Sequence, residues 1–347
     1  MSLRVVHYVD SSGPGGIESH LAGLLPALRA RGIDASLLLH ADYGSHPLRD
    51  EMAAAGVPCG TLAGGFPALR ARLGGLRPDI MHTHGYKAGL LARAARLLGG
   101  PPVVSTMHSG DLSAGRVGLY NRADAATARL SHLIAVSPAV AARHPAATPI
   151  PNGVAVPETA IPLGDAIGFA GRLSPEKGPL VFGEMAARFP DRRFLVFGDG
   201  PLRETLRAAA PPNLTLRGAV PSMAPHWREI GLLVMPSVFE GLPMAALEAM
   251  ARGAPVAAFA VGALPELLGE GHGFLAPPGD GDALARNLNA WIHLGPAERG
   301  RLAERMRARV AARYSIAACA AATAAFYDRV LRRAGATSLP AAAADPG

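Results

Sequence analysis

Strand-like apolar runs alternate with helical patterns along most of the chain, and this alternation limits the fold more than any other feature. In the first half the runs occupy residues 3–9, 34–40, 79–84, 102–108 and 133–137. After Pro162 the alternation begins again, with runs at 166–173, 192–198, 214–220, 232–237 and 255–261. Strands that alternate with helices build parallel sheets, and continuously apolar strands suit sheets covered on both faces. The pattern predicts an α/β protein with two doubly wound parallel sheets.

The restart after Pro162 also predicts the domain boundaries. Residues 1–157 form the first domain and residues 163–313 the second, joined by a proline-rich linker within TPIPNGVAVPETAIP. Residues 314–333 have the pattern of a helix, which we expect to pack back toward the first domain. The tail, 334–347, offers little that could pack, so we expect it to be disordered.

The composition is that of a globular protein. Hydrophobic residues make up 49% of the chain and charged residues 18%, which excludes a disordered chain. Cys59 and Cys319 lie in different halves without a CxxC motif, so we expect buried free thiols in a reducing compartment. The N-terminus lacks the features of a signal peptide, and no stretch of about 18 apolar residues indicates a membrane span. We therefore expect a cytoplasmic protein.

The net charge is +7 and is unevenly distributed. Residues 1–157 hold 14 Lys and Arg against 9 Asp and Glu, whereas the remainder holds 20 against 18. Such a surplus favours an anionic ligand, an anionic membrane surface or nucleic acid, although an arginine-rich proteome gives the same balance. Aromatic residues make up only 5% of the chain, too few for base stacking, and we expect no nucleic-acid partner.

A glycine-rich loop, SSGPGG at 11–16, lies between the first apolar run and a helical pattern. Ligands of parallel sheets bind where such loops leave the carboxyl ends of strands. Gly15 and Gly16 would let backbone N–H groups approach an anion. A dinucleotide fingerprint needs a third glycine where this chain has Glu18, so a dehydrogenase is not favoured. A tight turn without a ligand is the alternative.

A second candidate segment is FAGRLSPEKGP at 169–179. Arg172 and Lys177 follow an apolar run and flank a Ser-Pro turn that opens a helix. Two cations beside a helix start can hold a diphosphate. Lys177 and Lys87 are the only lysines in the sequence, which favours a need for a compact point charge, although chance also explains it.

A third segment, VFEGLPMAALEAM at 238–250, predicts a buried helix from Pro243, because its residues leave no polar face. Glu248 would then be a carboxylate inside the protein, which needs a polar partner. It could accept the two hydroxyls of a ribose, while Glu240, at the mouth of the site, meets a hexose. The amides of Gly241 and Leu242 would add the positive end of the helix. The alternative is that Glu248 pairs with a buried arginine and Glu240 is exposed.

The segments GGIES, GRLSPEKG, VFGDGP and E-G-L-P-x-x-x-x-E follow one another in this order. Together they resemble the motifs of glycosyltransferase family 4, and the resemblance covers nearly the whole chain. It implies the GT-B fold, in which two Rossmann-like domains face each other across a cleft. It also implies a retaining glycosyltransferase of the hexosyltransferase type. The N-terminal domain would bind the acceptor and the C-terminal domain a UDP- or GDP-linked sugar.

The resemblance assigns roles on the donor side. It implies that Arg172 and Lys177 hold the diphosphate, that Glu240 contacts the transferred sugar and that Glu248 contacts the ribose. The other donor contacts that we expect are Gly15, Gly16, Gly218, Val220, Gly241 and Leu242.

Four further residues belong to the N-terminal domain. His108 matches the histidine that faces the donor sugar in this family, although a histidine at a strand end is often structural. His84 and Lys87 point to the same cleft and would touch the acceptor, or they are structural. Glu18 is either an acceptor-side residue or an ordinary first-turn acid of a helix.

The resemblance implies a mechanism without an established nucleophile, in which the departing phosphate accepts the proton of the acceptor. The catalytic contribution of Arg172, Lys177 and helix amides would be to stabilise charge on the leaving diphosphate. Because these cations lie on the protein, we expect no cofactor, no metal ion and no Asp-x-Asp metal site.

The acceptor would be a glycan, a lipid-linked sugar or a small molecule, as in bacterial polysaccharide or glycoconjugate synthesis. A catalytically silent nucleotide-sugar-binding subunit is the alternative from another class, and a sugar-nucleotide epimerase or a phosphorylase is the alternative among enzymes. Residues 66–77 combine leucines with arginines, which suits either peripheral contact with the anionic inner face of the cell membrane or an ordinary amphipathic helix.

Overall fold

Parallel strands form the core of each half of the chain in the computed structural model of the protein, which describes residues 2–108, 115–159, 161, 163–269, 273–333 and 335. Unit 1 comprises residues 1–153 and 316–347, and unit 2 comprises residues 154–315. The sequence predicts boundaries at residues 157 and 313, whereas the chain enters unit 2 at Val154 and leaves it at Ser315. Apart from Gly335, the tail predicted to be disordered lies outside the described residues.

The order in which the chain adds strands to the sheet of unit 1 reverses direction between β1 and β4. Its strands are β1 (Arg4–Val9), β2 (Asp34–Leu39), β3 (Cys59–Thr61), β4 (Ile80–His84), β5 (Val103–Met107), β6 (His132–Ala135) and β7 (Thr148–Pro149). Within the described residues their order is β3-β2-β1-β4-β5-β6-β7, and neighbours run parallel. Val5 lies opposite Ala35 on one side and Ile80 on the other. Doubly wound sheets bind ligands outside the carboxyl ends of the strands at such a point.

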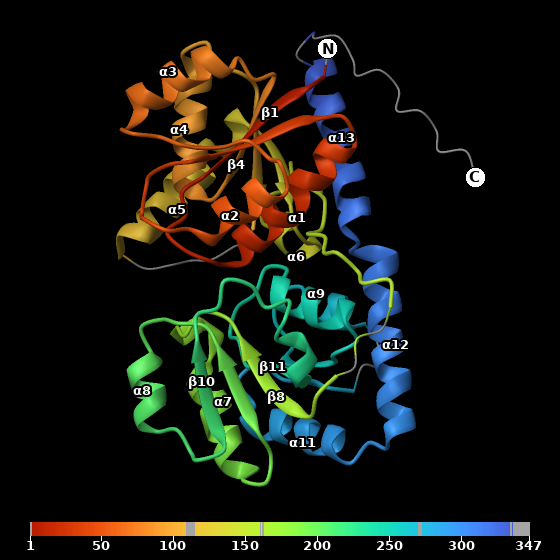
Figure 1. Ribbon diagram of the computed structural model, residues 1–347. Coiled ribbons are helices and arrows are strands. Elements are labelled where there is room, and N and C mark those ends of the chain that lie inside the picture. The colour runs from red at the N-terminus through yellow and green to blue at the C-terminus, as the bar shows by residue number, and fades with distance from the viewer. Residues whose placement is uncertain are drawn as a thin grey trace, which may run out of the picture. The chain divides into compact units, whose positions relative to one another are not determined.

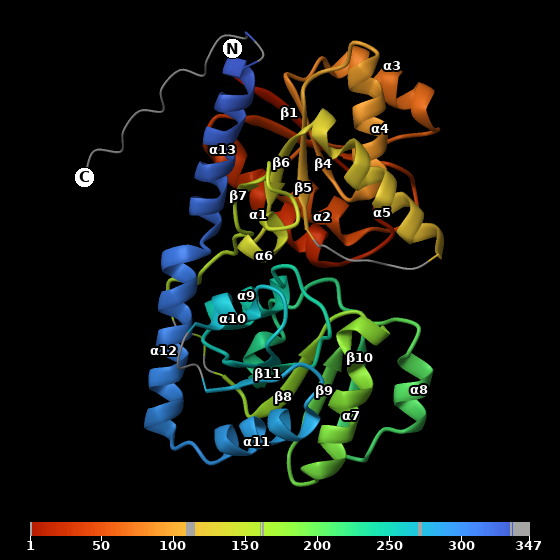
Figure 2. The same ribbon diagram turned by 180° about the vertical axis from the view of Figure 1, so that it is seen from behind.

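Helices cover both faces of this sheet (Figures 1 and 2). They are α1 (Gly16–Ala30), α2 (Pro47–Ala54), α3 (Phe66–Leu76), α4 (Tyr86–Leu97), α5 (Gly115–Thr127), the 3-10 turn η1 (Ala128–Leu130), α6 (Pro138–Ala141) and α13 (Ile316–Arg333). Successive residues of β1 point to opposite faces of the sheet and pack in two different apolar cores. Val5 packs in the core with α1 and α13, and Val6 packs in the core with α3 and α4. The C-terminal helix α13 therefore completes unit 1, beside α1, although it follows unit 2 in the sequence (Figures 1 and 2).

Unit 2 repeats the architecture. Its strands are β8 (Ala166–Ala170), β9 (Phe194–Phe197), β10 (Leu214–Gly218), β11 (Ile230–Met235), β12 (Val256–Phe259) and β13 (Leu275–Ala276). Their order in the described part of the chain is β10-β9-β8-β11-β12-β13, again parallel, with the turning point between β8 and β11. The helices are η2 (Pro175–Lys177), α7 (Pro179–Arg188), α8 (Arg203–Ala208), η3 (Trp227–Glu229), α9 (Met244–Ala251), α10 (Leu264–Leu268), α11 (Gly281–Ile292) and α12 (Pro296–Arg313).

The structure confirms the fold predicted from the alternation. Every strand predicted from an apolar run is present within a few residues of its predicted ends. The strands that the pattern misses, β3, β7 and β13, are two or three residues long and lie at sheet edges, too short to give a recognisable run. The prediction of two buried thiols is half wrong. Cys319 is buried in α13, but Cys59, at the start of the edge strand β3, is exposed.

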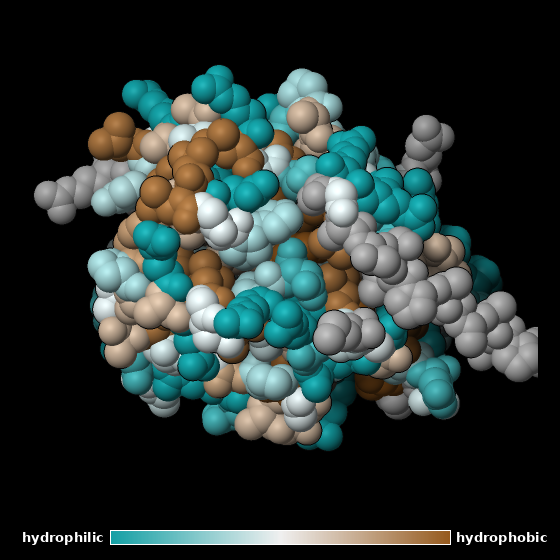
Figure 3. Space-filling model, turned by 90° about the horizontal axis from the view of Figure 1, so that it is seen from above, coloured by the Kyte–Doolittle hydropathy of each residue, from teal (hydrophilic) through white to brown (hydrophobic). Residues whose placement is uncertain are grey.

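The amphipathic segment 66–77 forms α3, whose apolar side faces its own unit. Leu69 and Leu73 are buried, and Phe66 and Leu76 pack against the same core, while Arg72 is exposed. That apolar side is covered, so the ordinary surface helix is the better interpretation. Apolar and hydrophilic side chains are interspersed on the face shown in Figure 3, as is usual for a protein surface. No helix within the described residues is long and apolar enough to cross a membrane.

One glycine holds the loop after β8 in place, and replacing it tests the backbone of unit 2. Gly178, at the start of α7, has φ of 66°, and a Cβ there would lie 2.2 Å from the carbonyl oxygen of Pro236. We expect Gly178→Ala to lower the free energy of unfolding by about 2 kcal/mol or more. The strain of an alanine in the left-handed backbone region and the clash of its Cβ with Pro236 both contribute to this loss. Gly300→Ala, in the exposed interior of α12 with nothing within 4 Å, is the control, and should stabilise by about 0.5–1 kcal/mol. Equal urea midpoints for the two variants would contradict this account.

Candidate functional site

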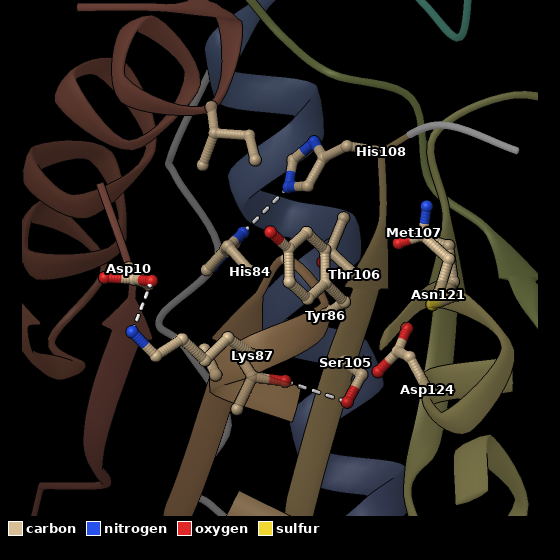
Figure 4. A pocket seen from close by; sticks show the side chains of 14 residues that line it. Asp10, His84, Tyr86, Lys87, Ser105, Thr106, Met107, His108, Asn121 and Asp124 are labelled. Carbon is tan, nitrogen blue, oxygen red and sulfur yellow. Dashed lines mark hydrogen bonds and ion pairs between the residues drawn. The ribbon is translucent and has the colours of Figure 1, made fainter. Parts of the chain in front are cut away.

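A polar pocket opens at the carboxyl ends of β1, β4 and β5, where the order of the first sheet turns back. Its volume is about 260 Å³. Figure 4 shows the side chains that line it. The polar ones are Asp10, Thr83, His84, Tyr86, Lys87, Ser105, Thr106, His108, Asn121 and Asp124. Hydroxyl, amide, imidazole and carboxylate groups thus line the pocket, which suits a ligand rich in hydroxyl groups.

The charged groups of the pocket are paired. Lys87 Nζ lies 3.0 Å from a carboxylate oxygen of Asp10 (Figure 4). Burial opposes the positive charge, but the hydrogen bond and the charge of Asp10 outweigh it and raise the pKa of Lys87. Asp124 is paired with Arg93, which is buried in α4. Burial still raises the pKa of Asp124 above its usual value. Each carboxylate therefore has a cation of its own, and the pocket presents little net charge.

His84 and His108 form one wall of the pocket. The Nδ1 atom of His84 lies 2.9 Å from Nε2 of His108 (Figure 4). On the other side of the ring, Nε2 of His84 lies 3.0 Å from Nδ1 of His7. Burial lowers the pKa of both His84 and His108 well below the usual value for histidine. These imidazoles are therefore neutral at physiological pH, and each can donate one hydrogen bond and accept another.

The structure brings together some of the residues that the sequence predicts for this unit. His84, Lys87 and His108 line one pocket. Glu18 lies in the first turn of α1 and is not among the pocket residues, although its neighbour Ile17 is. Burial raises the pKa of Glu18, although a hydrogen bond from Ser11 opposes the shift.

The glycine-rich loop leads into the same helix. Gly15 is the N-cap of α1, with extended backbone, and Gly16 begins the helix; both are exposed. Their position at a helix N-terminus fits the predicted approach of an anion, and their role stays a prediction.

Several pocket residues escaped the sequence analysis. Asp10 directly follows the first strand, so the rule that ligands bind at carboxyl ends could have found it. Asn121 and Asp124 lie on α5, and Tyr86 stacks on Tyr120 of that helix. No sequence motif marks these residues, because their approach to the pocket depends on how α5 packs.

A second candidate site lies in unit 2, at the carboxyl ends of β8 and β11. Lys177 Nζ donates to both carboxylate oxygens of Glu240 at 2.8 Å. The Glu240 side chain is only 4% exposed, whereas that of Lys177 is 30% exposed. The structure therefore joins two predicted residues that are 63 positions apart. The carboxylate of Glu240 is buried, and the lysine that neutralises it still reaches the surface.

The expected burial of the two glutamates is wrong. The sequence predicts a buried Glu248 and a Glu240 at the mouth of the site, but Glu240 is buried and Glu248 is partly exposed. The helix is otherwise as expected, since α9 buries most of its apolar residues. Glu248 accepts a hydrogen bond of 3.2 Å from the indole nitrogen of Trp227 and lies near Arg252. The alternative with an exposed Glu240 is therefore also wrong.

The remaining predicted donor residues lie at the end of β10 and in the loops after β8, β10 and β11. Arg172 is exposed. Burial acts to raise the pKa of Glu176, but a hydrogen bond from Ser174 and the charge of Arg172 help to outweigh it, so this pKa is lowered. Gly218 has φ of 74° and accepts a hydrogen bond from the amide of Gly198, which ties the ends of β9 and β10 together. Val220 follows two residues later and is partly exposed. Gly241 and Leu242 are buried, and α9 begins only at Met244.

The sequence does contain one Asp-x-Asp triplet, contrary to expectation, at Asp280 and Asp282. The side chain of Asp280 accepts a hydrogen bond from the amide of Ala283 and caps α11. Asp282 forms an ion pair of 2.6 Å with Arg188. Because these carboxylates cap a helix and bind an arginine, the triplet has a structural explanation.

One group of histidines has the proximity that a metal site needs. Ring nitrogens of His7, His82 and His84 lie within 4.8 Å of one another, and all three side chains are buried. Each of these rings is hydrogen-bonded to a hydroxyl group or to another ring. The expectation that no metal ion is needed stays a prediction.

Comparisons with known proteins cover both units. Residues 14–156 match the family model described as Glycosyltransferase Family 4, and residues 164–293 match the model described as Glycosyl transferases group 1. The chain belongs to glycosyltransferase family 4. Solved structures agree on the fold. HepE of Anabaena in complex with UDP and glucose has a TM-score of 0.80 at 20% identity, covering 93% of this chain and 99% of that one. Such a likeness shows the GT-B fold and no more.

Curated relatives match parts of this family 4 chain. The 2-deoxystreptamine glucosyltransferase of Streptomyces kanamyceticus is 39% identical over 137 residues, which are 36% of this chain and 35% of that protein. The UDP-Gal:alpha-D-GlcNAc-diphosphoundecaprenol alpha-1,3-galactosyltransferase of Escherichia coli is 31% identical over 220 residues, which are 51% and 56% of the two chains. The matches span about a third of the length of the first relative and about half of the second.

Removing the cation of the buried pair tests how unit 2 holds its carboxylate. We expect Lys177→Met to lower the free energy of unfolding by about 1–3 kcal/mol, because Glu240 is left buried without its partner. Adding Glu240→Gln should recover part of this loss, since the amide carries no charge. Arg207→Met removes an exposed pair with Glu204 and should cost about 0.5 kcal/mol or less. Urea unfolding of the variants measures these differences, and a Lys177→Met loss no larger than that of Arg207→Met would contradict the account.

Proposed function

We propose that the protein is a retaining glycosyltransferase that moves a sugar from a UDP-sugar to a hydroxyl-bearing acceptor. The observation that carries the proposal is the Lys177–Glu240 pair, which places a cation beside the loops that the family 4 motifs supply. A UDP-linked donor is favoured because the Escherichia coli relative is named for UDP-Gal. GDP-linked sugars, GDP-mannose among them, are the second choice.

On the donor side, Lys177 and Arg172 hold the diphosphate. Lys177 uses two of its hydrogens on Glu240 and has a third donor and an exposed end for a phosphate oxygen. Glu240 therefore orients Lys177 as well as contacting the transferred sugar. Glu248 is partly exposed and accepts the ribose hydroxyls, with Trp227 fixing one of its oxygens. The backbone at Gly218 and Val220 meets the base.

On the acceptor side, the pocket of unit 1 binds a polyhydroxy ring. Its carboxylates at Asp10 and Asp124 are neutralised by Lys87 and Arg93, so a neutral ligand fits better than a polycation. Relatives are named for 2-deoxystreptamine, a cyclitol with amino groups, and for D-inositol 3-phosphate, a cyclitol with a phosphate. The cyclitol ring that the two names share supports a cyclitol or sugar acceptor. His84 and His108 offer neutral imidazole groups to its hydroxyls.

The chemistry needs charge stabilisation more than a nucleophile. The bond between the sugar and the diphosphate breaks while the acceptor hydroxyl forms the new bond on the same face, and the departing phosphate takes the hydroxyl proton. Arg172 and Lys177 stabilise the negative charge that develops on the diphosphate. A catalytically silent nucleotide-sugar-binding subunit would bind the donor without transfer, and turnover by the purified protein separates the two.

Thermal stabilisation by UDP, GDP, ADP and TDP tests the donor site. Free nucleotide at 100 times its dissociation constant should add about 2.7 kcal/mol to the free energy of unfolding. We expect UDP to give the largest shift in Tm and Glu248→Ala to remove it, because the ribose loses its carboxylate partner. Glu184→Ala, at an exposed glutamate of α7, is the matched control and should keep the shift. A shift retained in Glu248→Ala would refute the assignment of the ribose site.

Independence from metal ions forms a separate prediction. We expect binding of UDP, and transfer or hydrolysis of the UDP-sugar, to persist in excess EDTA, because protein cations balance the diphosphate. Measured rates before and after treatment should agree within about twofold, less than 0.5 kcal/mol. Loss of turnover with EDTA and its recovery on adding Mg²⁺ or Mn²⁺ would show that a metal ion takes part.

A further inference from the structure

A line of hydrogen bonds runs through the interior of unit 1 and reaches α13. Thr106 Oγ1, on β5, lies 2.6 Å from Nε2 of His82 on β4. Nδ1 of the same ring lies 2.6 Å from the hydroxyl oxygen of Tyr327 on α13. That oxygen also lies 3.2 Å from Nε2 of His7 on β1. The Tyr327 hydroxyl thus joins two imidazoles that belong to different strands.

The line continues from His7 to the pocket. Nδ1 of His7 lies 3.0 Å from Nε2 of His84, and Nδ1 of His84 lies 2.9 Å from Nε2 of His108. His108 ends the line, and its Nδ1 atom lies on the side of the ring away from His84 (Figure 4). Within the described residues that nitrogen has no hydrogen-bond partner. The interior of unit 1 is therefore connected, ring by ring, to a pocket residue.

None of the groups in the line carries a charge at physiological pH. Burial lowers the pKa of His7 to about 3, with a smaller effect from His20, and holds the pKa of His82, His84 and His108 well below the usual value. Burial also raises the pKa of Tyr327 well above that of an exposed tyrosine. His20 packs its ring edge-on against His108 at 5.5 Å between centroids and is neutral for the same reason.

Neutrality gives the line a single direction. A neutral imidazole has one N–H and one acceptor nitrogen, and the tyrosine hydroxyl has one hydrogen to give. If His7, His84 or His108 changes its tautomer, the ring in contact with it has to change as well, or two lone pairs or two hydrogens meet. Two arrangements give every hydrogen in the line an acceptor, one with all four rings as Nε2–H tautomers and one with all four as Nδ1–H tautomers. A third arrangement, in which the Tyr327 oxygen accepts from both His82 and His7, leaves the buried hydroxyl hydrogen without an acceptor in the line, which costs free energy.

The contacts of Tyr327 select between them. Hydroxyl donors make shorter hydrogen bonds than N–H donors do, so the 2.6 Å contact with His82 fits donation by the phenol and the 3.2 Å contact with His7 fits donation to it. Thr106 makes an equally short contact with His82, but a neutral ring has a single acceptor nitrogen. The phenol is the more acidic of the two hydroxyls and takes that nitrogen.

We infer that Tyr327 is a positioning residue: its hydroxyl donates to His82 and thereby fixes His82, His7, His84 and His108 as Nε2–H tautomers. Nδ1 of His108 is then a hydrogen-bond acceptor, and any group that binds it has to be a donor, such as a hydroxyl or an amine. The tautomer assignment does not depend on the proposed function. Its consequence for the choice of acceptor does, because it assumes that the pocket binds one.

Nitrogen NMR of the full-length protein with ¹⁵N-labelled histidine tests the inference without a substrate. Correlations through two bonds distinguish protonated from unprotonated ring nitrogens, and single substitutions at the four histidines assign the signals. We expect the four rings to be Nε2–H tautomers near neutral pH, with Nδ1 of His108 unprotonated. An Nδ1–H form at His108, or a mixture of tautomers among the four rings, would overturn the inference.

Variants of two tyrosines separate positioning from packing. Tyr327→Phe keeps the ring in the core but removes the hydroxyl, so both directions become available and the nitrogen signals of His108 should move toward the average of the two tautomers. Tyr8→Phe is the matched control, because Tyr8 is equally buried and its hydroxyl lies 2.6 Å from Nδ1 of His40, outside the line. His108 signals that are unchanged in Tyr327→Phe, or moved equally in Tyr8→Phe, would contradict the role of Tyr327. If Tyr327→Phe does not fold, the wild-type tautomers decide.

Metal analysis of the purified protein tests the inference independently. Zn²⁺ or Co²⁺ bound by His7, His82 and His84 at one ion per chain would replace the hydrogen bonds that define the line. We expect purified protein to hold no stoichiometric transition metal, and added Co²⁺ to leave the nitrogen signals of these histidines in place. Stoichiometric binding with loss of those signals would overturn the inference in favour of a metal centre.

Discussion

The carboxyl ends of parallel strands determine where this protein can act. Every strand of a doubly wound sheet ends at the same edge, so loops far apart in the sequence meet there. In unit 2 this edge joins the loop after β8 to the loop after β11 and forms the Lys177–Glu240 pair. In unit 1 the same constraint brings Asp10, His84 and His108 to one pocket. The two candidate sites are therefore consequences of one topology used twice.

The two units solve the burial of polar groups in different ways. Unit 2 keeps a charged carboxylate, Glu240, by giving both of its oxygens to one lysine. Unit 1 instead buries histidines that lose their charge and satisfy one another through hydrogen bonds. A charged pair suits the binding of a diphosphate, while neutral rings suit hydroxyl groups, whose hydrogen bonds depend on which nitrogen carries the proton. This difference agrees with a donor side in one unit and an acceptor side in the other.

The sequence predicts the fold well because its longer strands lie in largely apolar runs and its helices are periodic. The loops after β8 and β11 could also be found, since GRLSPEKG and EGLP stand out among apolar runs. The Lys177–Glu240 contact could not be predicted, because it requires β8 and β11 to be neighbours in the sheet. The alternation of strands and helices does not determine the order of the strands. Glu248 meets the indole of Trp227, 21 positions away, and α9 begins at Met244, after Glu240. Neither the contact nor the boundary can be read from the local pattern.

The line from Thr106 to His108 shows a further limit of sequence patterns. Nine of the twelve histidines lie in residues 1–157, which indicates that this half is unusual but not which rings meet. Tyr327 lies on a helix that returns to unit 1 only after the whole of unit 2. Its contact with His7 spans 320 positions, far beyond any local signal. Packing of α13 against the sheet, rather than any motif, makes this contact.

Hydrogen–deuterium exchange of the full-length protein, with and without saturating UDP, tests the central claim that nucleotide binds at the carboxyl edge of the second sheet. The account predicts slower exchange in residues 171–178, 218–220 and 239–248, which lie after β8, at the end of β10 and after β11. It predicts no change in residues 189–193, at the opposite edge between α7 and β9. Protection confined to that opposite edge, or no protection anywhere in unit 2, would contradict the account.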